Sequence, residues 1–173
     1  MTEKISLDVL NTLPVSDFVR VLGGVFEHSP WVAEHAADHR PFATLDDLHA
    51  RMVQAIETAD DSARMALICA HPELAGKAAI RGELTPESTS EQAGAGLDQC
   101  SPQEFARLNQ LNQAYREKFG FPFILAVKGY DRAGIIQQFE RRLGLSPAQE
   151  IQESLLQIYR IGRFRLESML KEH

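Results

Sequence analysis

The sequence predicts an all-α fold of about seven to eight helices, in a single domain that spans residues 1–173. Apolar residues recur at three- and four-residue spacing along most of the chain, and proline or Ser/Thr signals mark the helix starts. A continuous apolar run at residues 121–127 has no obvious partner strand, so we expect a buried extended or helical segment there. A chain of 173 residues buries roughly 70% of its unfolded surface, which allows a sizeable core.

Composition and charge are typical of a soluble globular protein with neither a nucleic-acid nor a membrane partner. Hydrophobic residues make up 44% of the chain and charged residues 24%. The net charge of -6 lacks the basic excess of nucleic-acid or anionic-lipid binders, and no apolar run approaches the ~20 residues that cross a bilayer. The chain has two cysteines, of which Cys69 is expected to be a buried small hydrophobe, and no signal-peptide pattern, so we expect a cytoplasmic location.

The first third of the chain shows three short helical patterns. Apolar spacing over residues 7–13 predicts a helix that Pro14 ends, and Ser16 can cap a second helix over residues 18–25. A third helix starts at Pro30, because proline at the first helical position loses no hydrogen bond.

Two further helices precede the first candidate site. Thr44, with Asp47 three residues later, resembles a capping box at the start of an amphipathic helix. The next helix ends at His71, because the following Pro72 forces the residue before it out of the helical region.

Residues 72–100 are the least periodic part of the chain, which indicates a segment that is either functional or disordered. Ser101 and Glu104 then form a complete capping box. The helices expected behind it lie at residues 102–119, at 132–143 and from Pro147 onward.

His71 is the first candidate catalytic residue. The partial negative charge at a helix C-terminus favours the protonated imidazole, which is a competent proton donor near neutral pH. The alternative is simple compensation of the helix dipole.

The run of residues 87–92 is the second candidate site. Its hydroxyl, carboxylate and amide groups suit a ring with alternating carbonyl and N–H groups. The alternative is an ordinary helix cap. The residues are Glu87, Ser88, Thr89, Ser90, Glu91 and Gln92.

Arg165 is the third candidate, because a guanidinium fork binds a carboxylate through two hydrogen bonds. Arg160 and Arg163 are its local competitors, and a solvated surface position is the alternative. His35 and His39 have metal-ligand spacing, but a polar exposed helix face is the better interpretation, so no metal site is predicted. The chain also lacks a phosphate loop and a nucleophile elbow, which favours a mechanism without cofactors.

Five short blocks in order resemble the ureidoimidazoline (OHCU) decarboxylase family, and together they cover nearly the whole chain. The block His71-Pro72-Glu73-Leu74-Ala75-Gly76-Lys77 is similar to the family's His-Pro-(Asp/Glu)-Leu-Ala-Gly-(Lys/Arg) signature. The four other blocks are residues 26–31, 40–42, 84–97 and 108–124.

The resemblance implies a cofactor-free decarboxylase, often a homodimer. Its small-molecule substrate would be 2-oxo-4-hydroxy-4-carboxy-5-ureidoimidazoline, converted to (S)-allantoin in urate breakdown. The implied catalytic residues are His71 and Glu91. The implied substrate contacts are Pro72, Ser88, Thr89, Ser90, Glu91, Gln92, Arg165 and the main chain of Phe123, Ile124, Leu125, Ala126 and Val127. A non-catalytic helical module that binds a purine-derived ligand is the alternative function.

Overall fold

The computed structural model describes residues 3–171, apart from the side chains at positions 77 and 78. Within this part the regular structure is helical, and the only β-type pairing is an isolated bridge between Ile5 and Leu170. Eight of its ten α-helices have eight or more residues, so the prediction of an all-α fold with seven to eight helices is confirmed. None of the helices described is long and apolar enough to cross a membrane.

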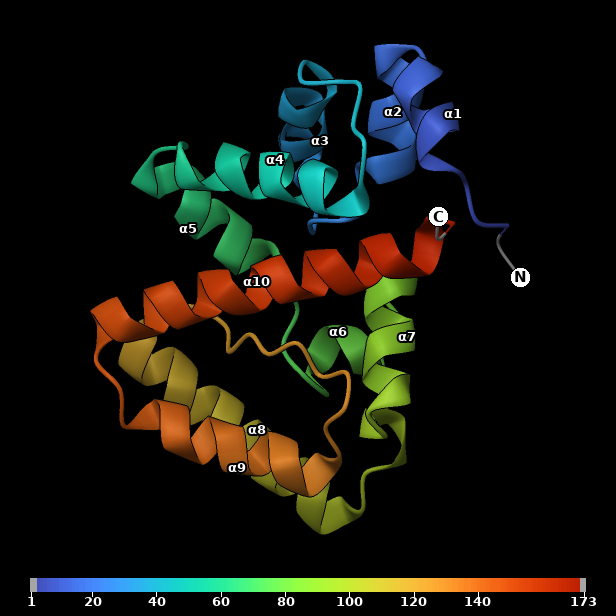
Figure 1. Cartoon of the computed structure of the whole chain (residues 1–173). Coiled ribbons are helices and arrows are strands. Elements are labelled where there is room, and N and C mark those ends of the chain that lie inside the picture. Colours follow the sequence, from blue (N-terminus) through green and yellow to red (C-terminus); the bar gives the residue numbers. More distant parts are fainter. Residues whose placement is uncertain (1–2, 172–173) are drawn as a thin grey trace. The chain divides into compact units, whose positions relative to one another are not determined.

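The chain divides into two compact units (Figure 1). The first contains residues 3–70 and 159–171, and the second contains residues 71–158. The long helix α10 (Pro147–Met169) begins in the second unit and ends in the first. The single domain expected from the sequence stays a prediction.

Five helices and the end of α10 build the first unit, with α3 packed between α2 and α4. Its buried side chains are mainly aliphatic and aromatic, including Phe18, Phe26 and Met52. His49 on α4 contacts the backbone carbonyl of Tyr159 on α10 at 2.9 Å. The helices are α1 (Leu7–Thr12), α2 (Val15–Leu22), α3 (Pro30–Ala37), α4 (Leu45–Glu57) and α5 (Asp61–Ala70).

Two sequence expectations in this unit are wrong. Ser16 does not cap α2, because the helix starts one residue before it and Pro14 occupies the N-cap. Cys69 is exposed rather than buried, because the buried face of α5 is set by Leu67 and Ile68, and each further residue turns about 100° around the helix.

The second unit contains α6 (Lys77–Ile80), α7 (Pro86–Gly94), the 3₁₀ turn η1 (Leu97–Gln99), α8 (Pro102–Phe119), α9 (Arg132–Leu143) and the start of α10. The capping box predicted at Ser101 and Glu104 is present at the start of α8. Gly120 ends α8 in the left-handed conformation, with φ of 81°.

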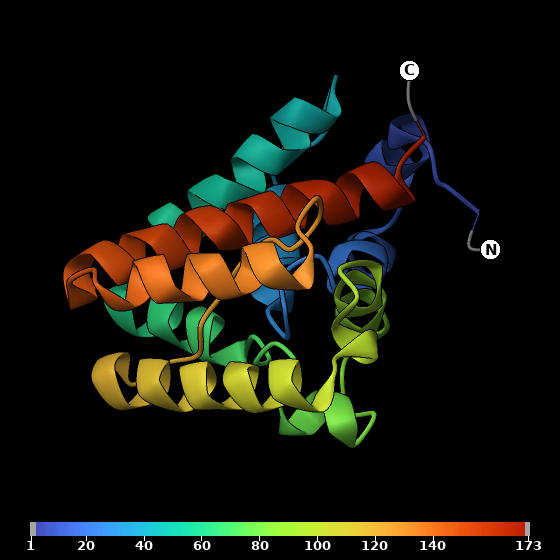
Figure 2. The same ribbon diagram turned by 90° about the horizontal axis from the view of Figure 1, so that it is seen from below.

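Helices α8 and α9 lie side by side and run in the same direction (Figures 1 and 2). The connection between them therefore has to return along both helices. Its residues 121–127 carry no helix or strand and are all buried, as expected from their continuous apolar run. After the short turn at Gly144, α10 starts in the direction opposite to that of α9 (Figure 2).

Candidate functional site

His71 is the first residue after α5 and the first residue of the second unit. Helix α5 ends at Ala70, in agreement with the effect of Pro72 on the residue before it. The His71 side chain is buried, with 6% of its surface exposed. The predicted position of His71 at the C-terminal end of a helix is confirmed.

The backbone that follows His71 is held by Gln92 of α7. The Gln92 side chain accepts a hydrogen bond from the Ala75 N–H at 3.0 Å and donates one to the Glu73 carbonyl at 3.3 Å. Ala75 has a φ of 52°, a left-handed conformation that costs a residue with a side chain about 1–2 kcal/mol. Gln92 therefore stabilises a tight turn directly beside His71. Its amide already makes these two hydrogen bonds and is not fully available to a substrate.

Helix α8 holds the same turn from a second direction. The Asn112 side chain is buried and donates to the Leu74 carbonyl at 3.0 Å. Arg116 forms an ion pair with Glu73. A side chain at Gly76 would place its Cβ 2.8 Å from the Glu73 Cβ, so the close turn requires glycine there. Three side chains and one glycine thus determine the path of residues 73–76.

Helix α7 separates the predicted residues of the run 87–92 by burial. Ser88 and Gln92 lie one turn apart and are buried, and Glu91 is half-buried. Thr89 and Ser90 are exposed, and the Thr89 hydroxyl donates to the Thr85 carbonyl of its own helix at 2.9 Å. The alternative that this run forms a helix cap is wrong, because residues 87–92 lie inside α7 and the cap is Thr85, whose side chain accepts from the Ser88 N–H.

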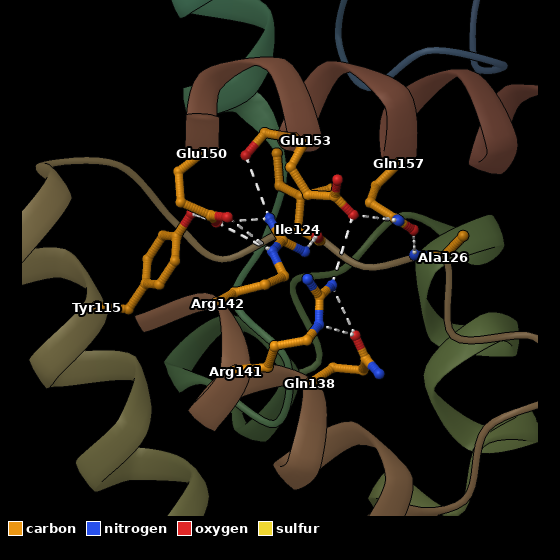
Figure 3. A network of polar contacts seen from close by, with 10 residues as sticks. Tyr115, Ile124, Ala126, Gln138, Arg141, Arg142, Glu150, Glu153 and Gln157 are labelled. Atoms are coloured by element: carbon orange, nitrogen blue, oxygen red, sulfur yellow. Dashed lines mark hydrogen bonds and ion pairs between the residues drawn. The ribbon is translucent and has the colours of Figure 1, made fainter. Parts of the chain in front are cut away.

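The buried segment of residues 121–127 is held by side chains of α9 and α10 (Figure 3). Arg142 donates to the Ile124 carbonyl, and Gln157 accepts from the Ala126 N–H at 3.0 Å. Among the hydrogen bonds of residues 3–171, none involves the backbone N–H of Leu125 or Val127. Buried backbone N–H groups without a protein partner are rare in folded proteins.

A fully buried ion pair between Arg142 and Glu150 supports the segment of residues 121–127. Arg142 contacts both oxygens of Glu150 through Nε, at 3.0 and 3.1 Å, and its guanidinium lies over the Phe123 ring at 4.4 Å. The Tyr115 hydroxyl donates to the same carboxylate. Burial, followed by this hydrogen bond, raises the pKa of Tyr115 above its ordinary value, so the phenol stays protonated and keeps donating.

Arg165 belongs to the first unit, whereas the predicted residues named so far belong to the second. It is 4% exposed and forms an ion pair with Glu27 at 2.8 Å. Of its local competitors, Arg160 is exposed, and Arg163 is paired with Asp46 and Glu167. Arg165 is thus the buried arginine of the three, but the carboxylate in contact with it belongs to the protein.

The two histidines do not share a helix as expected, because His35 lies on α3 and His39 lies two residues past the end of that helix at Ala37. The rings of His35 and His39 have centroids 5.1 Å apart. Within residues 3–171, no group of three or more His, Cys, Asp or Glu side chains could hold a metal ion.

Sequence reasoning did not single out Arg142, Glu150 and Gln157. A signal for them exists, because each occupies a helix position where an apolar residue is expected. Arg142 follows the buried Ile135 and Phe139 at helical spacing, and residues 150, 154, 157 and 161 of α10 share one buried face. Polar residues at such positions indicate a buried hydrogen-bond network.

A family model described as OHCU decarboxylase matches residues 11–167. The chain is 39% identical over 163 residues to the 2-oxo-4-hydroxy-4-carboxy-5-ureidoimidazoline decarboxylase of Haloferax volcanii, covering 94% of this chain and 95% of that protein. It is 40% identical over 167 residues to the uric acid degradation bifunctional protein PucL of Bacillus subtilis, covering 96% of this chain and 33% of the relative. The chain therefore spans about a third of that bifunctional protein, and a second one from Bacillus sp. gives the same proportion.

Two crystal structures have similar folds. A structure of (S)-allantoin synthase has a TM-score of 0.79 at 28% identity, covering 96% of this chain and 54% of the other. A structure of OHCU decarboxylase in the presence of (S)-allantoin has a TM-score of 0.67 at 20% identity, covering 82% and 92%, and shows the likeness of the fold alone. The family match over residues 11–167 confirms the resemblance seen in the five sequence blocks. The chain belongs to the OHCU decarboxylase family.

Proposed function

We propose that this protein is a carboxy-lyase that converts 2-oxo-4-hydroxy-4-carboxy-5-ureidoimidazoline to (S)-allantoin and carbon dioxide. The observation that carries the proposal is the 39% identity to the Haloferax volcanii decarboxylase, which extends over nearly the full length of both chains. The alternative of a non-catalytic binding module gains no support from the relatives found.

The substrate's own chemistry allows the reaction to proceed without an external electron acceptor. Its hydroxyl and carboxylate share one ring carbon, next to a carbon in an imine-like bond. When the bond to the carboxylate breaks, its electron pair forms a carbon–carbon double bond and the ring nitrogen takes up a proton. The resulting enol then gains a proton on the carbon that carries the ureido group and loses its hydroxyl proton. Addition from one face gives one enantiomer of allantoin.

We assign the proton transfer to His71, because histidine is the side chain that commonly acts as a general acid or base near neutral pH. The turn at residues 73–76, held by Gln92 and Asn112, supports this assignment by restricting the backbone next to the imidazole. Orientation matters because holding reacting groups in place supplies a large part of many enzymes' rate enhancement.

The other proposed substrate contacts differ in how strongly the geometry supports them. Ser88, Glu91 and the main chain of residues 123–127 are buried or half-buried in the second unit, as ligand-binding groups commonly are. Thr89 and Ser90 are exposed to solvent, so we expect them to contribute little to substrate binding. A contact of Arg165 with the substrate, a homodimer and a cytoplasmic location stay predictions.

Freshly prepared substrate provides the test of the function. Urate is oxidised and hydrolysed enzymatically, the protein is added at once, and the release of carbon dioxide is followed against a sample without protein. We expect release to accelerate in proportion to protein concentration. Tight binding of the substrate or of allantoin without faster release would instead favour the binding module.

A further inference from the structure

Gln157 links the buried segment 121–127 to helix α10. Its Oε1 accepts the Ala126 N–H at 3.0 Å, and its Nε2 donates to Oε1 of Glu153, one turn earlier, at 3.1 Å. The Gln157 side chain is 5% exposed. Because only the amide nitrogen can donate to a carboxylate, Glu153 determines that the amide oxygen faces Ala126.

A second side chain holds the same backbone two residues earlier. Arg142 of α9 donates to the Ile124 carbonyl, so the peptide groups of Leu125 lie between two contacts from different helices (Figure 3). The position of the Arg142 side chain is fixed by its hydrogen bonds to the Glu150 carboxylate. The orientation of this backbone is therefore set by α9 and α10 and not by hydrogen bonds of a sheet or helix of its own.

We propose that Gln157 is a positioning residue for the decarboxylation. It orients the peptide groups around Ala126, so that the backbone of residues 123–127 meets the substrate in one conformation, and it does not touch the substrate itself. This inference rests on the proposed function, in which that backbone binds the substrate. A displacement of about 1 Å in a substrate-positioning group can lower a rate by about 100-fold.

Gln157 allows a sharper test than its neighbours. Arg142 and Glu150 are a fully buried charged pair, so replacing either one perturbs the whole core. Gln157 is neutral, and its two hydrogen-bond partners are known. Gln152, on the same helix, is exposed and supplies a matched control for the loss of a glutamine.

The experiment compares four variants. Gln157→Leu removes the acceptor of the Ala126 N–H. Gln157→Glu places a second carboxylate one turn from Glu153, where like charges repel. The double variant Glu153→Gln/Gln157→Glu exchanges the two groups, so that the amide at position 153 donates to the carboxylate at 157, which again accepts from Ala126. Gln152→Leu is the control.

Two quantities are measured for each variant: kcat and KM with fresh substrate, and the hydrogen-exchange rate of the Ala126 amide by NMR. We expect Gln157→Leu and Gln157→Glu to lower kcat/KM by about 10- to 100-fold and to accelerate exchange at Ala126. The exchanged double variant should restore both quantities to within about threefold of the wild type, and the control should match the wild type.

An active wild type together with unchanged kcat/KM in Gln157→Leu would overturn the inference. So would a double variant that regains the slow exchange of Ala126 but not the activity. If Gln157→Leu does not fold, the double variant decides between these outcomes. A wild type that releases no carbon dioxide would count against the proposed function instead, which separates the two failures.

Discussion

A buried arginine–glutamate pair lies in each unit of the molecule, and the two pairs differ in their surroundings. Arg142 and Glu150 of the second unit are both 0% exposed, and the carboxylate also accepts the hydroxyl of Tyr115. Arg165 and Glu27 of the first unit are 4% and 1% exposed. The second carboxylate oxygen of Glu27 lies 3.9 Å from the ring of His28, which is 71% exposed.

The arginines also hold different backbone groups. Arg142 donates to the Ile124 carbonyl, within the segment proposed to meet the substrate. Arg165 donates to the carbonyls of Gly24 and Val25, at 3.3 Å each, in the loop after α2. The comparison teaches that burial and pairing alone do not identify a substrate-binding arginine. The arginine predicted from the sequence and the arginine that supports the predicted segment are different residues.

The largest effect should come from Glu150→Gln. The change leaves the Arg142 charge without its counter-ion in the core, so we expect the free energy of unfolding to fall by about 3–5 kcal/mol. Urea unfolding followed by far-UV circular dichroism measures this fall. Arg142→Met combined with Glu150→Gln removes both charges and should recover part of the stability. A double variant that is less stable than the single one would contradict this account of the pair.

Glu27→Gln should cost less, about 1.5–3 kcal/mol, which is the range for a hydrogen bond to a charged group. The carbonyls of Gly24 and Val25 still face the Arg165 guanidinium in this variant and offset part of its charge. Urea unfolding followed by far-UV circular dichroism measures this loss in the free energy of unfolding. A loss as large as that of Glu150→Gln would show that the two pairs are energetically equivalent.

Two tyrosines, one in each unit, predict how stability depends on pH. Burial raises the pKa of Tyr159 to about 12, and burial and Glu150 raise that of Tyr115. An unfolded tyrosine ionises near pH 10. The stability that the buried, protonated phenol contributes is therefore fully present below about pH 10 and is lost as the pH rises through about 12. Tyr159→Phe should lose less stability than the wild type between about pH 9 and about pH 11, as urea unfolding at both values would show. An equal loss in both proteins would contradict the assignment.

The smallest effect should come from Asp46→Asn, which removes a carboxylate paired with Arg163 near the surface. Asp46 is 75% exposed in its side chain, and Arg163 keeps a second partner in Glu167. We expect a change below about 1 kcal/mol in the free energy of unfolding. A larger loss would mean that this pair resembles the buried pairs more than its exposure suggests.

The sequence predicts the long helices well, because their signals are local. Proline at the first turn of α3, the capping box of α8 and the apolar spacing of α9 all depend on neighbours within a few residues. Helix α7 was not predicted, because its buried positions carry Ser88 and Gln92 rather than apolar side chains. Apolar periodicity does not reveal a helix whose buried face is polar.

The positions of the candidate residues in the fold could be predicted only in part, for a similar reason. His71 stands at a helix end that Pro72 marks, so its position can be read locally. The contacts of Gln92 with Ala75 and of Gln157 with Ala126 join residues 17 and 31 positions apart. Such contacts depend on the tertiary arrangement of the helices, and periodicity within one helix does not reveal the partner.

The central claim is that one histidine controls the protonation that makes this decarboxylation fast and stereospecific. The most direct measurement follows the circular dichroism of allantoin formed from fresh substrate, with the wild type and with His71→Asn at equal concentration. We predict that the wild type rapidly gives a circular dichroism signal of one sign. The folded variant should give only the racemic allantoin of the slow, uncatalysed reaction, which has no net signal. A His71→Asn variant that forms one enantiomer at the wild-type rate would contradict the account.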